Sequence, residues 1–318
     1  MSNGRDTLER VAPDAARALR VIEVTAWDQA ESVGLLDLTE LIGRVCGSVL
    51  GLAPLAPPSP VVPGRWSSAS GDDWRALLDL TDADRAGLRF AEQFSLDVGS
   101  ITEAERDDFL RNFATRAGVV APIIYVMDFL PRVWASLDAL FGDGGAAGSP
   151  PAPAEGGIWA AVDGLIRTVP RLDALDPLTT ELVRLRGARQ HRCRICQSLR
   201  SRPALLAGAD DADFAAVDDH EHSDLGPLAK AALAFADAMV WTPAHLDAGM
   251  ILALEQQTSD TQRVELVLDV ARNALNKIAV ALDADAPHVE DGIEIFDVDP
   301  NGDLIYGLPL VAPGTTGS

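Results

Sequence analysis

Cys193 and Cys196, two of the three cysteines in this 318-residue chain, lie three positions apart in the stretch HRCRICQSLR. Residues at i and i+3 of a helix share one face, which brings two sulfurs close enough to form a disulfide. Arg192, Arg194 and Arg200 surround the pair, and nearby cations favour the reactive thiolate. A second thiol within reach resolves the sulfenic acid that a peroxide leaves on the first. The spacing therefore indicates a redox-active Cys-x-x-Cys pair.

Two other interpretations of the pair stay open. Zinc takes four nitrogen or sulfur ligands in a tetrahedron, and candidate ligands here are His191, Cys193, Cys196, His220 and His222. No second Cys-x-x-Cys motif in the sequence supports such a site. The pair can also be two small apolar residues buried on one helix. The remaining cysteine, Cys46, has no partner in sequence and is expected in the core.

Composition and charge narrow the class of protein. The formal net charge of −22 gives a surface that repels phosphate backbones and anionic lipids, so neither a nucleic acid nor a membrane is expected as a partner. The longest apolar stretch, VVAPIIYVM, is far shorter than a bilayer span. The N-terminal residues lack the basic and apolar regions of a signal peptide. Together these features predict a soluble cytoplasmic protein.

The sequence predicts an all-α protein with two helical units. Hydrophobic residues make up 47% of the chain and aromatic residues only 5%, and long stretches repeat apolar residues at helical spacing. A proline-rich segment at 52–64 interrupts the first unit. A Gly/Pro/Ala-rich segment at 142–157 predicts a flexible linker between an N-terminal unit at 1–141 and a C-terminal unit at 158–318.

The two units resemble each other. The stretch AGLRFAEQF at 86–94 aligns with AALAFADAM at 231–239, and LPRVWASLDA at 130–139 aligns with LNKIAVALDA at 275–284. Both alignments have the same offset of 145 positions, without a gap. A constant offset favours an internal duplication, with two tandem repeats packed about a pseudo-twofold axis. Only the second repeat carries the Cys-x-x-Cys motif.

Two further elements are predicted from pattern. The stretch at 260–284 reads as one long amphipathic helix. Near the C-terminus, IEIFDVDPNGDLIYGL alternates apolar and polar residues around a Pro-Asn-Gly turn, which fits either a β-hairpin or an extended tail.

Glu181, twelve positions before Cys193, completes the pattern ELVRLRGARQHRCRIC. With the segments that follow it, over most of residues 171–284, this pattern resembles the alkylhydroperoxidase D and carboxymuconolactone decarboxylase superfamily. The resemblance implies an all-α fold and a site at Glu181, Cys193 and Cys196. It implies thiol-dependent reduction of a hydroperoxide or disulfide, with Cys196 attacking and Cys193 resolving. It also implies no tightly bound organic cofactor and a partner dithiol as reductant.

One position departs from the family pattern. The histidine expected four residues after the second cysteine is Arg200 in this chain. Arginine stays protonated and cannot pass a proton near neutral pH, although it can support a thiolate or pair with Glu181. His191, just before the motif, is the nearest substitute for the missing imidazole. The expected site is therefore Cys196, Cys193, Glu181, Arg200 and His191.

The resemblance leaves two alternative functions. One is a lyase or isomerase of the carboxymuconolactone decarboxylase type, which does not need a disulfide. The other is a catalytically silent scaffold or ligand-binding protein. The sequence also leaves open whether the chain forms a homo-oligomer.

Overall fold

Several helices begin at residues that cap them. The computed structural model of the chain describes residues 3–58, 64–144 and 149–310. Thr81 and Asp84 form a capping box at the start of one helix, and Ser259 and Gln262 form another. Pro13 occupies the first turn of a third helix, where its missing N–H costs nothing.

The fold is all-α, as predicted. The helices of the first half are α1 (Gly4–Val11), α2 (Pro13–Ser32), α3 (Leu36–Leu50), η1 (Trp74–Ala76), α4 (Asp82–Asp97), η2 (Val98–Ser100), α5 (Glu103–Phe113), η3 (Ala114–Arg116) and α6 (Ala117–Phe141). Those of the second half are α7 (Gly157–Thr168), η4 (Val169–Arg171), α8 (Pro177–Gln190), α9 (Arg194–Ser198), α10 (Arg202–Leu206), α11 (Asp211–Ala216), η5 (Val217–His222), α12 (Pro227–Trp241), α13 (Ala248–Gln257), α14 (Asp260–Ala274) and α15 (Asn276–Ala281). The helix predicted over 260–284 is thus divided at Leu275, which keeps right-handed helical dihedrals.

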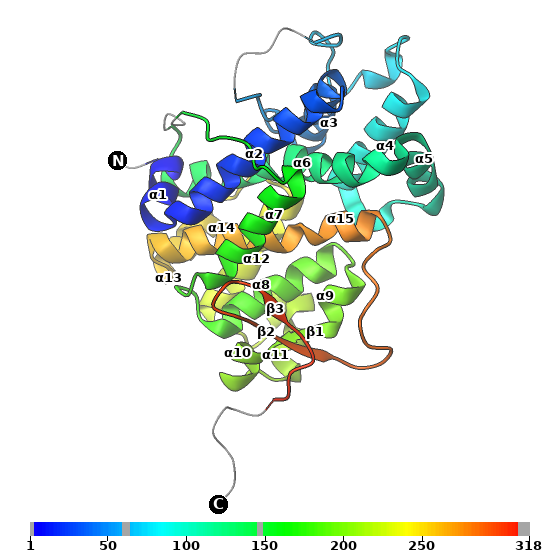
Figure 1. Cartoon of the computed structure of the whole chain (residues 1–318). Coiled ribbons are helices and arrows are strands. Elements are labelled where there is room, and N and C mark those ends of the chain that lie inside the picture. Colours follow the sequence, from blue (N-terminus) through cyan, green and yellow to red (C-terminus); the bar gives the residue numbers. More distant parts are fainter. Residues whose placement is uncertain (1–2, 59–63, 145–148, 311–318) are drawn as a thin grey trace, which may run out of the picture.

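The same set of packing partners recurs in each half. Helix α3 packs on α4 and α6, and α8 packs on α12 and α14. Helices α6 and α14 contact each other, and one hydrophobic core includes residues of both halves. In Figure 1, α14 and α15 cross the middle of the molecule, with α2 to α5 on one side and α8 to α11 on the other. The superposition of the two halves stays a prediction, since shared partners do not test it.

The segment predicted as a linker is attached to the first half. Its residues 145–148 lie outside the described part of the chain. Beyond them, the amide of Ala154 donates to Thr25 Oγ1 at 2.9 Å, and the amide of Ile158 donates to Gln29 Oε1 at 2.7 Å. Helix α7 then packs on α2. The second half therefore begins by lying against the first.

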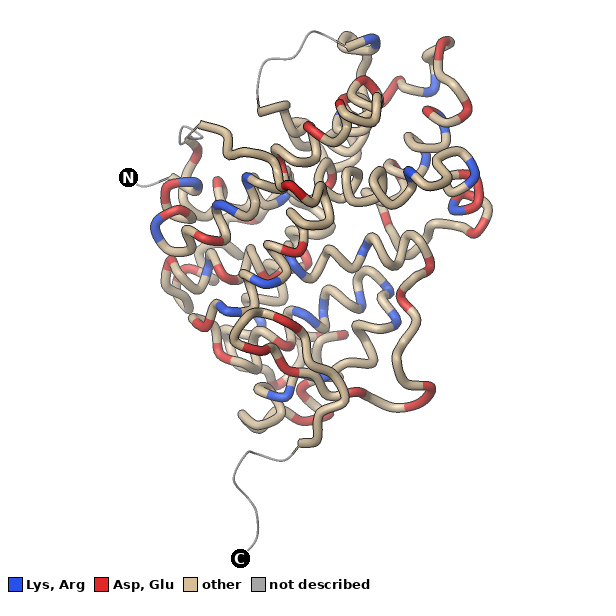
Figure 2. Tube along the Cα trace, viewed as in Figure 1, with Lys and Arg blue, Asp and Glu red and all other residues tan. Residues whose placement is uncertain are grey.

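Helix α6 is the most apolar element of the core. The helical run Glu103–Phe141 is long and apolar enough to cross a membrane by length and composition, but 72% of its apolar window is buried inside the fold. A core helix of a soluble protein has these properties. In Figure 2, basic and acidic residues are interspersed over the helices and loops in view, and neither kind gathers in one place.

The predicted C-terminal hairpin is present. Strand β2 (Glu294–Val298) pairs with β3 (Leu304–Ile305) in antiparallel orientation. A third short strand, β1 (Leu199–Ser201), follows the Cys-x-x-Cys motif and pairs with β2 in parallel, with Leu199 opposite Glu294. This pairing attaches the C-terminal segment beside the cysteines.

Buried charges join the two halves. Asp128 on α6 is fully buried and pairs with Arg132 at 2.8 Å and with Lys277 of α15. Burial alone would raise the pKa of Asp128, but the two cations hold it below its ordinary value. Burial also lowers the pKa of Lys277 to about 8, although Asp128 opposes the change. The ion pair across the halves is therefore shielded from solvent by the surrounding core.

Candidate functional site

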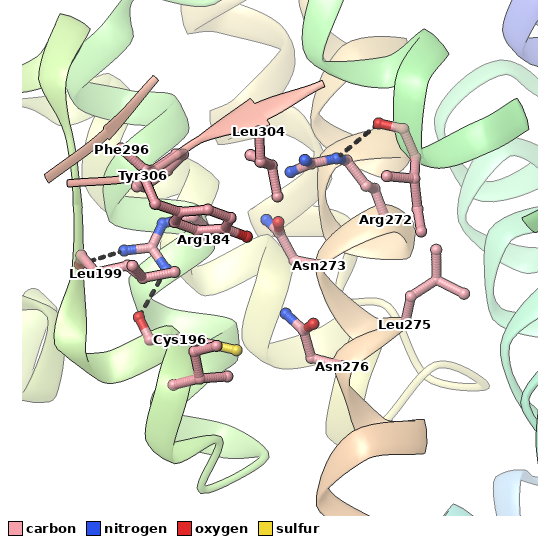
Figure 3. A pocket seen from close by; sticks show the side chains of 12 residues that line it. Arg184, Cys196, Leu199, Arg272, Asn273, Leu275, Asn276, Phe296, Leu304 and Tyr306 are labelled. Atoms are coloured by element: carbon pink, nitrogen blue, oxygen red, sulfur yellow. Dashed lines mark hydrogen bonds between the residues drawn. The ribbon is translucent and has the colours of Figure 1, made fainter. Parts of the chain in front are cut away.

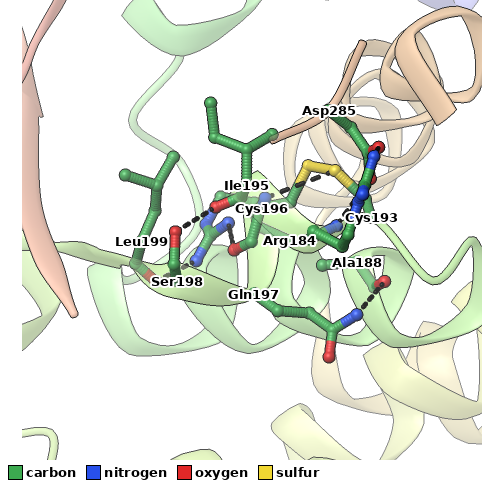
Figure 4. The surroundings of a disulfide bond; sticks show 10 residues. Arg184, Ala188, Cys193, Ile195, Cys196, Gln197, Ser198, Leu199 and Asp285 are labelled. Carbon is green, nitrogen blue, oxygen red and sulfur yellow. Dashed lines mark hydrogen bonds and ion pairs between the residues drawn. A yellow bond between two sulfur atoms is a disulfide. The ribbon is translucent and has the colours of Figure 1, made fainter. Parts of the chain in front are cut away.

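Cys193 follows a tight turn after α8, and Cys196 lies within the short helix α9. Arg192 has a left-handed φ of 56°, which turns the chain after α8. Cys193 then caps α9, and its sulfur accepts the amide of Cys196 at 3.3 Å. The cysteines form a disulfide with their Cα atoms 5.3 Å apart, as the spacing predicts (Figure 4). Cys193 is wholly buried, whereas Cys196 retains 4% of its surface.

Glu181 and Arg184 hold this turn in place. Both oxygens of Glu181 accept from Arg184, Nε at 2.6 Å and Nη2 at 2.8 Å, and Oε1 also accepts the amide of Ser201 at 3.1 Å. Arg184 in turn donates to the carbonyls of Cys196 at 2.7 Å and Leu199 at 2.8 Å. The contact between Glu181 and Cys196 is therefore indirect: Glu181 binds Arg184, and Arg184 binds the carbonyl of Cys196.

Cys196 lines a small cavity of about 120 Å³. Apolar walls come from Leu199, Leu275 and Phe296. Figure 3 shows Asn273 and Asn276 directed from α14 and α15 into the space that Cys196 faces. The hairpin closes one side with Leu304 and Tyr306. Burial raises the pKa of the Tyr306 phenol, which therefore stays protonated near neutral pH.

A larger cavity of about 360 Å³ adjoins the first. The two share Arg184, Arg272, Asn273 and Phe296 in their linings. Asp269 lines the larger cavity, is buried, and has an Oδ2 atom without a hydrogen-bond partner among the described residues. Burial raises the pKa of Asp269 well above its ordinary value; Glu265 adds to this effect and Arg272 opposes it. The carboxyl is therefore prone to hold a proton.

The raised pKa of Asp269 predicts how stability depends on pH. The folded state binds this proton more tightly than the unfolded state, so stability falls as pH rises above about 4. Asp269→Asn removes the ionisable group, and we expect the variant to be more stable than the wild type at pH 7. Each unit of pKa difference corresponds to about 1.4 kcal/mol. Urea denaturation at pH 4 and pH 7 measures the free energy of unfolding of the variant and the wild type. If the variant differs from the wild type by the same amount at both pH values, the prediction is wrong.

Arg200 and His191 do not reach the cavity of Cys196. Arg200 donates to the carbonyls of Gln197 and Leu199 at 2.9 and 2.7 Å and lies over the ring of Phe214. The expected ion pair with Glu181 is made by Arg184 instead. His191 is buried near Arg132 and Lys277, and burial followed by these cations lowers its pKa to about 3. His191 lines a separate small pocket that also includes Arg132 and Lys277.

The other arginines beside the cysteines are paired with carboxylates. Arg192 contacts Asp97 at 2.9 Å, and the Arg194 amide donates to Asp285 Oδ2 at 2.7 Å. His220 and His222, candidates for zinc, contact Asp237 and Asp219 at 3.0 and 2.7 Å. Within the described ranges, His, Cys, Asp and Glu side chains form no cluster of three or more that fits a metal ion.

Sequence reasoning missed the polar residues that α14 and the start of α15 contribute to the cavities. Asp269, Arg272 and Asn276 recur at spacings of three and four in a largely apolar stretch, with Asn273 beside Arg272. Such spacing puts polar groups on one stripe of a helix that must be buried. That stripe was the sequence pattern that could have pointed to these residues. For Arg184 the pattern was its position three residues after Glu181 on the same helix.

Two proteins of Mycobacterium tuberculosis are similar to this chain. The uncharacterized protein Rv2313c of strain H37Rv and the uncharacterized protein MT2376 of strain CDC 1551 are each 41% identical over 234 residues. The match covers 71% of this chain and 81% of each relative. The chain belongs to the family of these proteins. No protein-family model and no solved structure matches it.

Membership of this family assigns no chemistry to the site, since the printed names of the relatives state none. The geometry that bears on function consists of a disulfide whose Cys196 borders a cavity, a buried Glu181–Arg184 pair, and polar residues of α14 and α15 in the same cavity lining.

Proposed function

We propose that this protein is a thiol–disulfide oxidoreductase of the alkylhydroperoxidase D type, which reduces a hydroperoxide with Cys193 and Cys196. The observation that carries the proposal is a Cys193–Cys196 disulfide in which Cys196 borders a cavity. A disulfide between buried cysteines alone would be a structural link. Here the cavity offers a substrate access to one sulfur, while the second sulfur is already at bonding distance.

The reaction balances with these two thiols. The Cys196 thiolate attacks an oxygen of the hydroperoxide, the O–O bond breaks, and the alcohol leaves after taking up a proton. The resulting sulfenic acid at Cys196 is attacked by the thiol of Cys193, which releases water and forms the disulfide. A dithiol protein then reduces the disulfide by exchange and is itself oxidised.

The side chains around the pair have positioning roles in this scheme. Arg184 fixes the carbonyls of Cys196 and Leu199, and Glu181 fixes Arg184. Tyr306, a protonated phenol in the same cavity, is a hydrogen-bond donor for a substrate oxygen. Because Arg200 and His191 lie outside this cavity, the proton of the leaving alcohol comes from another group or from water.

A redox titration tests whether the pair cycles. We expect a dithiol reagent to expose two alkylatable thiols in the peptide that carries Cys193 and Cys196, and one equivalent of hydroperoxide to remove both. Mass spectrometry would then record the loss of two hydrogens from that peptide. A peptide that keeps two alkylatable thiols after peroxide would contradict the proposal. A lyase of the carboxymuconolactone decarboxylase type, or a silent scaffold, does not require this cycle.

A further inference from the structure

Arg272 is a cation in the wall of both cavities, and the carboxyl that acts most on its charge is Asp269 of the same helix. Its Nε atom donates to the carbonyl of Ile166 at 3.2 Å, and within the described part of the chain it forms no ion pair. Burial lowers the pKa of Arg272, but arginine remains charged at neutral pH. In Figure 3 its terminal nitrogens extend from α14 into the space beside Asn273 and Leu304. A half-buried guanidinium with free N–H groups is incomplete without an anion.

Other polar groups around Arg272 also lack partners. The amides of Asn273 and Asn276 make no side-chain hydrogen bond with any described residue. Asp269, one turn before Arg272, is 6% exposed and its Oδ2 is unpartnered although it lines the larger cavity. Buried polar groups normally have hydrogen-bond partners, so the unpartnered Oδ2 of Asp269, in the same cavity lining as Arg272 and Asn273, points to a ligand.

The charges decide what kind of ligand fits. Arg184 is neutralised by Glu181, and Arg202 contacts Asp297, which leaves Arg272 as the cation available to a ligand. Asp173, Glu181 and Asp297 also border the larger cavity and disfavour a ligand with two negative charges. A carboxylate carries one charge and matches the guanidinium fork. Asp269 in its protonated form donates a hydrogen bond to such a group and does not repel it.

We propose that the joined cavities bind an organic monocarboxylate, with its carboxylate on Arg272 and its remaining atoms directed towards Cys196. This inference rests on the proposed function, under which the bound monocarboxylate is a hydroperoxide substrate that also carries a carboxylate. The apolar walls at Leu199, Leu275 and Phe296 suit a carbon skeleton. The larger cavity, of about 360 Å³, lies within the range of small-molecule sites.

The binding claim is tested on the reduced protein with two alkylating probes that differ in charge. Iodoacetate and iodoacetamide both need the Cys196 thiolate, so the ratio of their rate constants cancels thiolate reactivity and isolates the effect of the carboxylate. We expect Arg272→Gln to lower the iodoacetate-to-iodoacetamide ratio about tenfold or more, as for the loss of one charge-assisted hydrogen bond. Peptide mass spectrometry at Cys196 reports both rates.

Matched controls separate a binding site from the general field of the protein. Arg189→Gln removes the same charge from α8, and Arg189 lines neither cavity. We expect that variant to keep the ratio within about twofold, because Arg189 is already paired with Asp218 and lines neither cavity. Arg272→Lys retains the charge and should keep part of the preference. Equal losses of the ratio in Arg272→Gln and Arg189→Gln would overturn the proposal.

A second measurement needs no variant and so does not depend on whether Arg272→Gln folds. Benzoate should slow the alkylation of wild-type Cys196 by iodoacetamide, and benzamide, its neutral counterpart, should not. If benzoate and benzamide protect Cys196 equally, or if neither protects it at about 10 mM, the carboxylate site is overturned. Neither probe requires peroxide turnover. A protein that prefers the anionic probes but fails the redox titration would retain this site and lose the proposed function.

Discussion

Cys196→Ser is expected to abolish hydroperoxide reduction, with turnover falling about a thousandfold or more, because a serine hydroxyl does not replace a thiolate nucleophile. Cys196 is the sulfur that borders the cavity, whereas Cys193 is wholly buried. Cys193→Ser should therefore also stop turnover but still consume one equivalent of hydroperoxide and leave a sulfenic acid on Cys196. Trapping with dimedone and peptide mass spectrometry measures this intermediate.

Cys46→Ala is the matched control for the loss of a thiol. Cys46 is buried away from the disulfide, and burial, with a smaller effect from Asp128, raises its pKa to about 12. We expect this variant to turn over like the wild type. If Cys193→Ser fails to consume hydroperoxide while Cys196→Ser succeeds, the roles assigned to the two cysteines are reversed.

Asp128→Asn is expected to cost about 3–5 kcal/mol of stability, because it leaves Arg132 and Lys277 as buried cations without a carboxylate. Asp128 is on α6 and Lys277 is on α15, so the loss weakens the contact between the two halves. Chemical denaturation of the wild type and the variant gives the difference in free energy of unfolding. A loss of this size is a large share of the stability of an ordinary protein.

Asp163→Asn provides the comparison for an exposed ion pair. Asp163 pairs with Arg167 on the surface of α7, and such pairs contribute about 0–1 kcal/mol. Should Asp128→Asn prevent folding, Lys277→Met in the same chain should restore part of the stability by removing one unpaired charge. Equal small losses in Asp128→Asn and Asp163→Asn would mean that the buried pair adds nothing to the contact.

Local signals in the sequence were sufficient for much of the fold. Apolar residues at helical spacing located the helical region at 260–284, which contains α14 and α15, and the alternation around Pro-Asn-Gly located the C-terminal hairpin. The i, i+3 spacing of Cys193 and Cys196 was sufficient to predict their disulfide. Each of these features depends on residues that are close in sequence, where helix and turn geometry fix the outcome.

Features that depend on distant residues were not predictable in this way. The pairing of Leu199 with Glu294 joins segments far apart in the chain, and neither segment alone specifies the other. Arg192 adopts a left-handed conformation between His191 and Cys193, and non-glycine residues adopt it too rarely for the sequence to indicate it. The choice of Arg184 over Arg200 as the partner of Glu181 depends on which of them the fold buries beside it.

The most direct test of the central claim is the stoichiometry of a single turnover. Reduced wild-type protein, freed of reductant, is mixed with one equivalent of an organic hydroperoxide, and both the alcohol product and the Cys193–Cys196 disulfide are counted. The proposed chemistry predicts one alcohol and one disulfide for each hydroperoxide consumed. If the hydroperoxide persists, or is consumed while both thiols stay free, the Cys-x-x-Cys pair is not the catalytic centre.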